Sequence, residues 1–432
     1  MVVLTRFVLF FIMLSSLLIY LFSNIKYIGE GSSSLVFLLV TFIISVILIF
    51  FSYKDYKMTF QISSKVLALF FVYFMVTILF NDSAILKANT IGTTGGIILF
   101  YLLGVLISVN SKIFVINSKK NILYVSLYFS LVISYLLFDT TSELLKLLRT
   151  DIFFISKFDD LYQRPGNFLI IIFLIYSYFI SLLINSLFSE FRKVTHMLFL
   201  LYVINTFNIL LLSQLFGSNH AFIVVLIVFI LTTLFFIFTI IKITTEKRIA
   251  TINNNYKKYN FEKYALIIIL SISCFQTFIL FQELLFKISE IGFDKIRILN
   301  FGSVSSVSSV SSRWDLLSLF NIHFVHNPFF GNIIVDKITT GEGTYVHSFL
   351  GSLLTHQGIF GFIIFSYFMY FSFKEYFIVL KENVDYLFLI YFFSIFIIAV
   401  MFLFFTNISI WFLIGLIFLP IGLKNRKEKT IE

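Results

Sequence analysis

Long apolar runs separated by short polar segments recur along the whole chain. A helix that crosses the hydrocarbon core of a bilayer needs about 20 mainly apolar residues, and twelve windows meet or approach this length. They are residues 4–22, 35–51, 66–80, 91–109, 122–138, 168–187, 194–213, 221–241, 264–282, 348–370, 386–405 and 408–423. The pattern therefore predicts an all-α polytopic membrane protein, in which the third and twelfth windows are short for a full crossing.

The composition agrees with this reading and with a single transmembrane domain over residues 1–432. The chain is 59% hydrophobic and only 12% charged, whereas soluble domains carry about 25% charged residues. Arg6 falls near the start of the first window, and we take it to precede the span itself; the other windows contain no Lys, Arg, Asp or Glu. No small-residue cleavage site follows the first span, so we expect a retained helix and not a removed signal peptide.

Basic residues orient the predicted spans. With the N-terminus in the cytoplasm, 21 of the 32 Lys and Arg fall on the cytoplasmic side, and nine of the other 11 lie in two long segments. Short cytoplasmic loops are rich in Lys and Arg, so we expect both termini to be cytoplasmic. The net charge of +10 then reflects topology, and we expect no nucleic-acid partner.

The two long segments, residues 139–167 and 283–347, fall on the external side. Loops of this length are uncommon without a function. The first contains SELLKLLR, in which three leucines share a helical face, and it ends in QRPGNF beside the membrane. The second contains SVSSVSSVSS at 303–312, which we interpret as a flexible tether.

An amphipathic helix near residues 313–323 follows the tether. Ser312 and Asp315 have the spacing of a capping box, and Trp314, Leu317 and Phe320 then share one face. Such a helix lies in the membrane interface, with its tryptophan at the depth of the headgroups. A proline at 328 ends the element.

Several short motifs carry a family resemblance. SSRWDLL, NPFFG, YVHSFLGSLL and QGIFG follow one another between residues 311 and 361, and RPGNF precedes an earlier span. This order resembles the O-antigen polymerase and O-antigen ligase superfamily of bacterial envelope glycosyltransferases. The chain departs from that family at Ser348, where the family usually has asparagine.

The resemblance implies a GT-C-type membrane glycosyltransferase that acts on the external, periplasmic face of the bacterial inner membrane. Its donor would be a glycan on undecaprenyl pyrophosphate. The acceptor would be another lipid-linked repeat unit in a polymerase, or the lipid A core in a ligase. We favour the polymerase, whose product would be O-antigen or capsular polysaccharide. A protein that regulates chain length is a further partner that the resemblance suggests.

Arginines are the predicted means of stabilising the departing diphosphate. The chain contains no D-x-D motif for a divalent ion and a single cysteine, Cys274, so we predict neither a metal nor a cofactor. A guanidinium group binds phosphate oxygens bidentately and stays charged. Arg164 and Arg313 lie in the matched motifs, and Arg297 is the third candidate. The alternative for each is an anchor at the membrane interface.

His347 is the candidate for a second role in the reaction, beside the stabilisation of the diphosphate by arginines. It precedes the tenth window at its external end, where a neutral imidazole can bind the lipid phosphate or assist deprotonation of the acceptor hydroxyl. His356 is nine residues further on, which places it on the opposite face of a straight helix, so we expect it to be packed inside the protein. Gly358 and Gly361 beside it favour close helix contact over phosphate binding. His323 and His326 with His347 lack a suitable carboxylate, which argues against zinc.

A flippase for lipid-linked oligosaccharides, or another secondary transporter, is the principal alternative from a different class. Transporters place ionisable groups near the bilayer midplane along the transport pathway. In our reading the spans of this chain contain no Lys, Arg, Asp or Glu, and the residues with candidate chemistry lie in the two external segments. That distribution favours a reaction at the membrane surface.

Overall fold

The computed structural model of the protein describes most of the apolar windows. The described residues are 2–26, 32–53, 62–79, 84–117, 119–147, 163–187, 192–215, 218–247, 260–291, 320, 324–325, 327–331, 349–380, 394 and 407–417. Arg297, Arg313 and His347 lie outside them.

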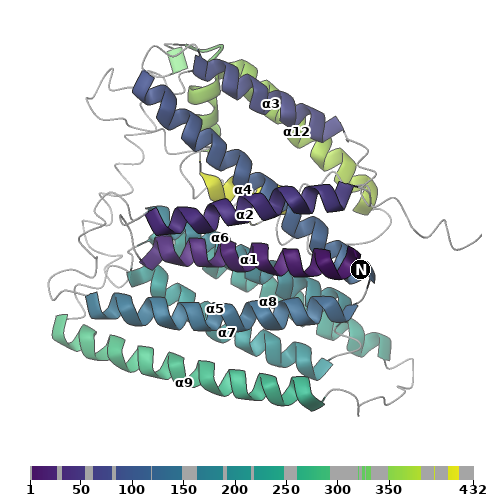
Figure 1. Ribbon diagram of the computed structural model, residues 1–432, viewed down its shortest axis with the longest axis vertical. Helices are drawn as coiled ribbons and strands as arrows, with labels where there is room; N and C mark the ends of the chain where they lie inside the picture. Colours follow the sequence, from purple (N-terminus) through teal and green to yellow (C-terminus); the bar gives the residue numbers. More distant parts are fainter. Residues whose placement is uncertain are drawn as a thin grey trace, which may run out of the picture.

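The described part of the chain is α-helical, and none of it forms a β-strand. Figure 1 shows the helices running roughly side by side. They are α1 Val2–Lys26, α2 Ser32–Tyr53, α3 Ile62–Leu79, α4 Ala84–Asn117, α5 Lys119–Leu147, α6 Gln163–Leu187, α7 Arg192–Leu215, α8 Asn219–Lys247, α9 Asn260–Ile291, α12 Phe349–Leu380 and α14 Ile408–Ile417.

Eight described helices are long and apolar enough to cross a membrane: α1, α3, α4, α5, α6, α7, α8 and α12. Shorter apolar stretches occur in α2 (35–51) and α9 (266–282). Of the last two predicted windows, 386–405 lies outside the described residues except for Ser394, and α14 covers ten residues of 408–423. The protein is therefore an all-α, multi-pass membrane protein.

Helix α6 is the centre of the bundle. No residue between 168 and 184 is more than 7% exposed, and α1, α5, α7, α8 and α14 all contact this helix. An apolar helix of a membrane protein can face either lipid or other helices, and the burial of α6 shows that it faces other helices. By contrast, α2, α3 and α9 expose large apolar side chains, such as Phe50, Leu79 and Phe275, as expected for helices that face lipid.

Hydroxyl and amide groups connect the central helices. Asn205 of α7 donates to the Ser134 hydroxyl of α5 (2.9 Å) and to the Tyr176 hydroxyl of α6 (3.2 Å). Ser177 and Tyr202 make a second α6–α7 hydrogen bond at 2.9 Å. Polar side chains within a membrane bundle are stabilised by such bonds between helices, so this network fixes how α5, α6 and α7 pack together.

Pairs of side-chain contacts fix the relative directions of neighbouring helices. These contacts show that three pairs of the described helices are antiparallel. Helices α1 and α6 make the contacts Phe10–Phe179 and Tyr20–Phe168, and α7 and α8 make Phe199–Phe236 and Tyr202–Phe229. Helices α3 and α12 make Phe70–Phe365 and Tyr73–Gln357.

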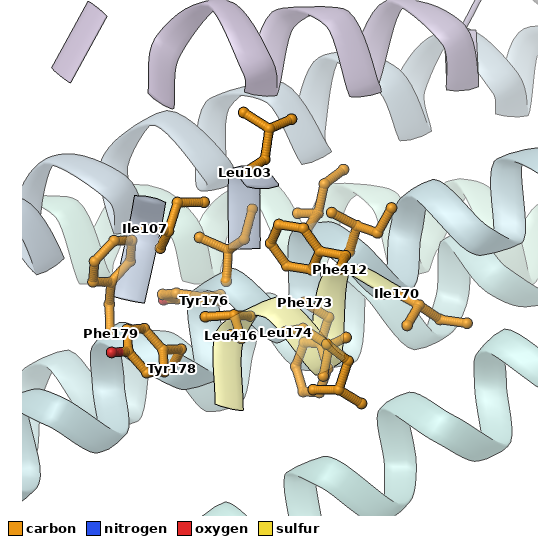
Figure 2. Packing of buried hydrophobic residues seen from close by; sticks show 14 of the residues in the cluster. Leu103, Ile107, Ile170, Phe173, Leu174, Tyr176, Tyr178, Phe179, Phe412 and Leu416 are labelled. Atoms are coloured by element: carbon orange, nitrogen blue, oxygen red, sulfur yellow. The ribbon is translucent and has the colours of Figure 1, made fainter. Parts of the chain in front are cut away.

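Helices α4 and α14 run parallel in close contact. A Cβ atom added to Gly96 would meet Ile408, whereas one added to Gly104 would lie 2.3 Å from the carbonyl oxygen of Phe412. A Cβ atom on Gly415 would lie 2.1 Å from the carbonyl oxygen of Tyr101. Glycines thus let the two backbones touch, as in other membrane helix pairs. Figure 2 shows Leu103 and Ile107 of α4 near Phe412 and Leu416 of α14, with α6 side chains beside them.

The directions of α12 and α14 follow from these pairs. The link from α3 to α4 is only residues 80–83, and four residues span at most about 14 Å, so α4 runs back antiparallel to α3. Because α12 is also antiparallel to α3, it runs in the same direction as α4 and α14. Leu380, at the end of α12, and Asn407, at the start of α14, therefore lie at opposite ends of the bundle.

Arg6 corrects the predicted start of the first span. It lies inside α1 and is only 2% exposed, and its Nε donates to Oδ1 of Asn110 in α4 at 3.0 Å. Asn110 in turn donates to the carbonyl oxygen of Leu106. The apolar windows thus contain one buried basic side chain, and its charge is accommodated by a hydrogen bond to a distant helix.

Both long segments that the sequence analysis places outside the membrane begin as continuations of helices. Helix α5 continues to Leu147 and α9 to Ile291, so Leu144 and Leu145 belong to the end of α5. Thr140 and Thr141 are buried, which shows that the protein interior extends past the apolar window of α5.

Substitution of Gly104 by alanine tests the α4–α14 contact. The added methyl group meets backbone atoms of α14 that cannot rotate away, and overpacking of this kind costs about 1–3 kcal/mol. We expect a lower melting temperature for the detergent-purified G104A variant. Gly95 on the same helix has no atom within 4 Å of an added Cβ, so G95A is the matched control and should be neutral or stabilising. Equal melting temperatures of the two variants would contradict the close packing.

Candidate functional site

The NPFFG and QGIFG motifs lie against each other. Residues 327–330 form a turn, which the amide of Gly331 closes by donating to the carbonyl oxygen of Asn327 at 2.9 Å. Helix α12 is broken at Gly358, whose φ of 63° and ψ of −171° are not helical. The turn packs directly against this break.

Main-chain hydrogen bonds join the turn to the second part of α12. The amide of Ile359 donates to the carbonyl oxygen of Pro328 (2.8 Å), and that of Phe360 donates to the carbonyl oxygen of Phe329 (3.2 Å). The first amides of any helix segment lack acceptors within the helix. Here the turn supplies those acceptors.

Tyr73 of α3 forms a hydrogen bond on the other side of the break. Its hydroxyl donates to the carbonyl oxygen of Gln357 at 2.8 Å, and this carbonyl is the last one before Gly358. Backbone polar groups inside a membrane need a partner within the protein. The turn and Tyr73 together meet this requirement on both sides of the break.

Only glycine fits at the two contact positions. A Cβ atom on Gly331 would lie 2.4 Å from the carbonyl carbon of His356, and one on Gly358 would lie 2.3 Å from the carbonyl oxygen of Phe329. Both glycines also have positive φ angles, 74° and 63°. The expectation that Gly358 permits a close approach is confirmed, but its partner is the backbone of a turn and not another helix.

A second polar cluster lies at the start of α6. Arg164 is in the first turn of this helix. Two residues later, Gly166 faces the connection between α7 and α8, and a Cβ atom there would lie 2.2 Å from Oγ of Ser218 and 3.0 Å from Nε2 of His220. Ser218 and His220 are themselves within hydrogen-bonding distance, at 3.2 Å from Oγ to Nδ1. His220, which showed no pattern in the sequence, therefore lies beside the first turn of α6, the turn that contains Arg164.

The start of α14 joins the same cluster. Nδ2 of Asn407 donates to Oδ1 of Asn167 at 3.0 Å, and the Ser409 hydroxyl donates to the carbonyl oxygen of Asn167 at 3.1 Å. Oδ1 of Asn407 also accepts from the amide of Ser409 at 2.9 Å, which is the geometry of a helix N-cap. Three helices, α6, α8 and α14, therefore begin at one end of the bundle.

An aromatic cluster shows where the turn docked on α12 and the polar cluster at the start of α6 lie relative to each other. The rings of Phe70 (α3), Phe365 (α12) and Trp411 (α14) lie 5.6–5.8 Å apart. Tyr73 is about one helical turn beyond Phe70, and Asn407 is about one turn before Trp411. Because α3 runs toward this end and α14 runs away from it, both polar regions lie on the same side of the aromatic cluster.

The described residues include one of the four predicted site residues, Arg164, and also include His356. Arg164 lies at the start of the central helix, and His356 is only 1% exposed, which confirms that it is packed inside the protein. The other three predicted site residues are outside the described part of the chain. Of the predicted amphipathic helix, only Phe320 is described; it is helical, and its ring stacks on that of Phe324 at 5.3 Å.

Some site residues could not be found from the sequence. Gln357 and Tyr73 carry no signal except that Gln357 begins the QGIFG motif, and His220 and Asn407 lie in no recognisable pattern. In the described part of the chain, no group of three or more His, Cys, Asp or Glu is placed to hold a metal ion.

Comparison with known proteins gives no relative: the chain matches no protein-family model, no curated protein and no solved structure.

Substitution of Gly358 by alanine tests the interlocked turn. This backbone conformation is nearly exclusive to glycine and costs another residue about 1–3 kcal/mol, and the methyl group also meets the carbonyl oxygen of Phe329. We expect G358A and G331A to lower the melting temperature of the purified protein. G92A, in open space on α4, is the control. A G358A protein as stable as G92A would show that the turn does not dock on α12.

Proposed function

We propose that the protein is a metal-independent membrane glycosyltransferase that polymerises oligosaccharide repeat units carried on undecaprenyl pyrophosphate. The observation that carries this proposal is the docking of the NPFFG turn on the QGIFG break of α12. Two of the motifs that resemble the O-antigen polymerase and ligase superfamily thus form one structural unit. Their joint requirement for glycine supports a shared role for the segment between them.

Two candidate catalytic residues lie near this unit in sequence, Arg313 before the turn and His347 between the turn and the break. His347 precedes the first residue of α12 by two positions, so covalent geometry keeps His347 near that end of the helix. Arg164 is in the first turn of α6, where the amide groups of the helix N-terminus add positive potential. These positions suit binding of a diphosphate.

The reaction transfers a glycan from its diphosphate carrier to a hydroxyl group of the acceptor. The bond between the sugar and the diphosphate breaks, and negative charge develops on the departing phosphate. Arg164, Arg313 and Arg297 stabilise that charge in our proposal, because guanidinium groups form charged, bidentate hydrogen bonds with phosphate oxygens. His347 binds the phosphate or accepts the proton of the acceptor hydroxyl.

The site faces the exterior in this proposal, with a fold of the GT-C type and twelve spans. The distribution of Lys and Arg supports the orientation. The starts of α6, α8, α12 and α14 share one end of the bundle, as alternating crossings require. The opposite placement of Leu380 and Asn407 supports a further crossing at 386–405. In our proposal, which the resemblance supports, the protein lies in the bacterial inner membrane and has a chain-length regulator as a partner.

A ligase would use the same arginines and histidine with a different acceptor, the lipid A core. A flippase is less well supported, because the described spans bury few groups that can carry a charge near neutral pH: Arg6 is the one buried Lys, Arg, Asp or Glu among the described residues and lies near the start of α1, and His356 lies beside the break in α12. A transport pathway near the midplane would be expected to contain ionisable groups.

Gel analysis of surface polysaccharide in a deletion strain tests the function. Loss of a polymerase leaves lipid core with at most one repeat unit. Loss of a ligase leaves bare core and polymer on the lipid carrier, and loss of a flippase leaves repeat units in the inner leaflet. Either of the last two results would contradict the proposal.

Arg313→Ala and His347→Ala should abolish polymer formation when each variant is expressed in that strain. Removal of one group that stabilises a transition state typically lowers the rate about 10²–10³-fold. Membrane levels of the variants should equal those of the wild type, as measured by immunoblot. Normal polymer length in both variants would refute the site.

Polymerisation by the purified protein should continue in EDTA, because arginines and not a divalent ion stabilise the leaving group. The measurement is polymer length from lipid-linked repeat units with and without the chelator. Loss of activity in EDTA that one divalent ion restores would refute the metal-independent mechanism.

A further inference from the structure

Gln357 is a buried amide without a partner in the part of the chain that the structure describes. The residue is 0% exposed, and neither Oε1 nor Nε2 has a hydrogen-bond partner among the described residues. Buried polar side chains almost always have at least one partner, because burial removes their bonds to water. An amide with both atoms unpaired therefore destabilises the conformation in which it is found.

Other buried amides in the described spans differ from Gln357. Asn24, Asn110 and Asn205 each donate a hydrogen bond within the protein, and Asn208 donates to Thr277 although its oxygen is unpaired. The protein can thus satisfy amides at buried positions. Gln357 is an exception at the candidate site itself.

The position of Gln357 is determined by its surroundings. In a continuous helix, Cβ atoms four residues apart are separated by about 5–6 Å, but a Cβ atom on Gly361 would lie only 2.4 Å from Cβ of Gln357 and 2.9 Å from a ring carbon of Tyr73. The break at Gly358 therefore turns the Gln357 side chain onto the space that Gly361 leaves open. The Tyr73 hydroxyl donates to the main-chain carbonyl oxygen of Gln357. The side-chain carboxamide has no such partner among the described residues.

We propose that the Gln357 carboxamide binds neighbouring hydroxyl groups of the lipid-linked glycan; this inference rests on the proposed function. A carboxamide presents a donor and an acceptor side by side, and each sugar hydroxyl both donates and accepts. An uncharged amide suits an uncharged sugar, whereas the arginines suit the diphosphate. The two parts of the substrate are thus recognised by different residues.

Glycan binding requires a local movement, since the carboxamide is buried. Either the side chain turns outward or the Asn327–Gly331 turn shifts from Gly358. The unpaired amide raises the free energy of the closed form relative to a form in which the glycan satisfies it. A ligand shifts a conformational equilibrium in this way when it binds one form better than the other.

Binding of two ligands by the purified protein tests this role. The first ligand is the lipid-linked repeat unit, extracted from a strain that lacks the chain, and the second is undecaprenyl pyrophosphate without a glycan. We expect the wild type to bind the first more tightly. Gln357→Leu should lower affinity for the first about tenfold, the effect of one lost hydrogen bond, and leave affinity for the second unchanged.

The same substitution should raise the melting temperature of the ligand-free protein, because it replaces an unpaired buried amide with an apolar side chain of similar size. Opposite effects on stability and glycan affinity distinguish a binding residue from a structural one. Ser372→Ala is the control: Ser372 is a buried residue of α12 whose hydroxyl has no partner, and its removal should not change either affinity. Gln357→Met serves as a second variant if the leucine protein does not fold.

The outcomes separate this inference from the proposed function. Unchanged glycan affinity in Gln357→Leu and Gln357→Met would overturn the role of Gln357 and leave the polymerase proposal standing. A wild type that binds neither ligand would overturn both. Equal wild-type affinity for the two ligands would overturn the inference alone, because the glycan would then add nothing to binding.

Discussion

Satisfaction of main-chain hydrogen bonds within a membrane is the constraint on which the candidate site depends. A helix interrupted in the bilayer exposes amide and carbonyl groups that lipid cannot bond. The break at Gly358 persists because carbonyl groups of Pro328 and Phe329 accept from the amides after it, and Tyr73 donates to the carbonyl group before it. The turn and the break are therefore a single feature, and neither is stable in this form without the other.

This constraint explains why glycine occurs at both contact positions. Two backbones that exchange hydrogen bonds across a helix break come closer than any side chain allows, and the positive φ angles of Gly331 and Gly358 add a second reason. The polar groups at the break are Gln357, Tyr73 and the main chain, with the buried His356 beside them. The charged groups of the proposed site are arginines on other segments of the chain. In our proposal, Gln357 at the break therefore binds the glycan, and the arginines stabilise the departing diphosphate.

The sequence was a good guide to what depends on local composition and a poor one to what depends on distant partners. A run of apolar residues is a local property, so the helices were predictable. Arg6 was placed before its span because its partner, Asn110, is in another helix. The break at Gly358 was not predicted either, since the apolar pattern continues through it and the turn that stabilises it lies 27 residues earlier. His220 showed no pattern because its neighbour Gly166 is remote in sequence. Arg313, Arg297 and His347 remain predictions.

The parallel contact of α4 with α14 has a consequence for biogenesis. Helices enter the membrane in order as the ribosome synthesises them, so α4 and the central α6 are inserted well before α14 exists. Until then, the glycine-lined strip of α4 and one side of α6 have to be covered by lipid or by an insertion chaperone. The packing around α6 is therefore complete only after α14 has been synthesised and inserted against α4 and α6.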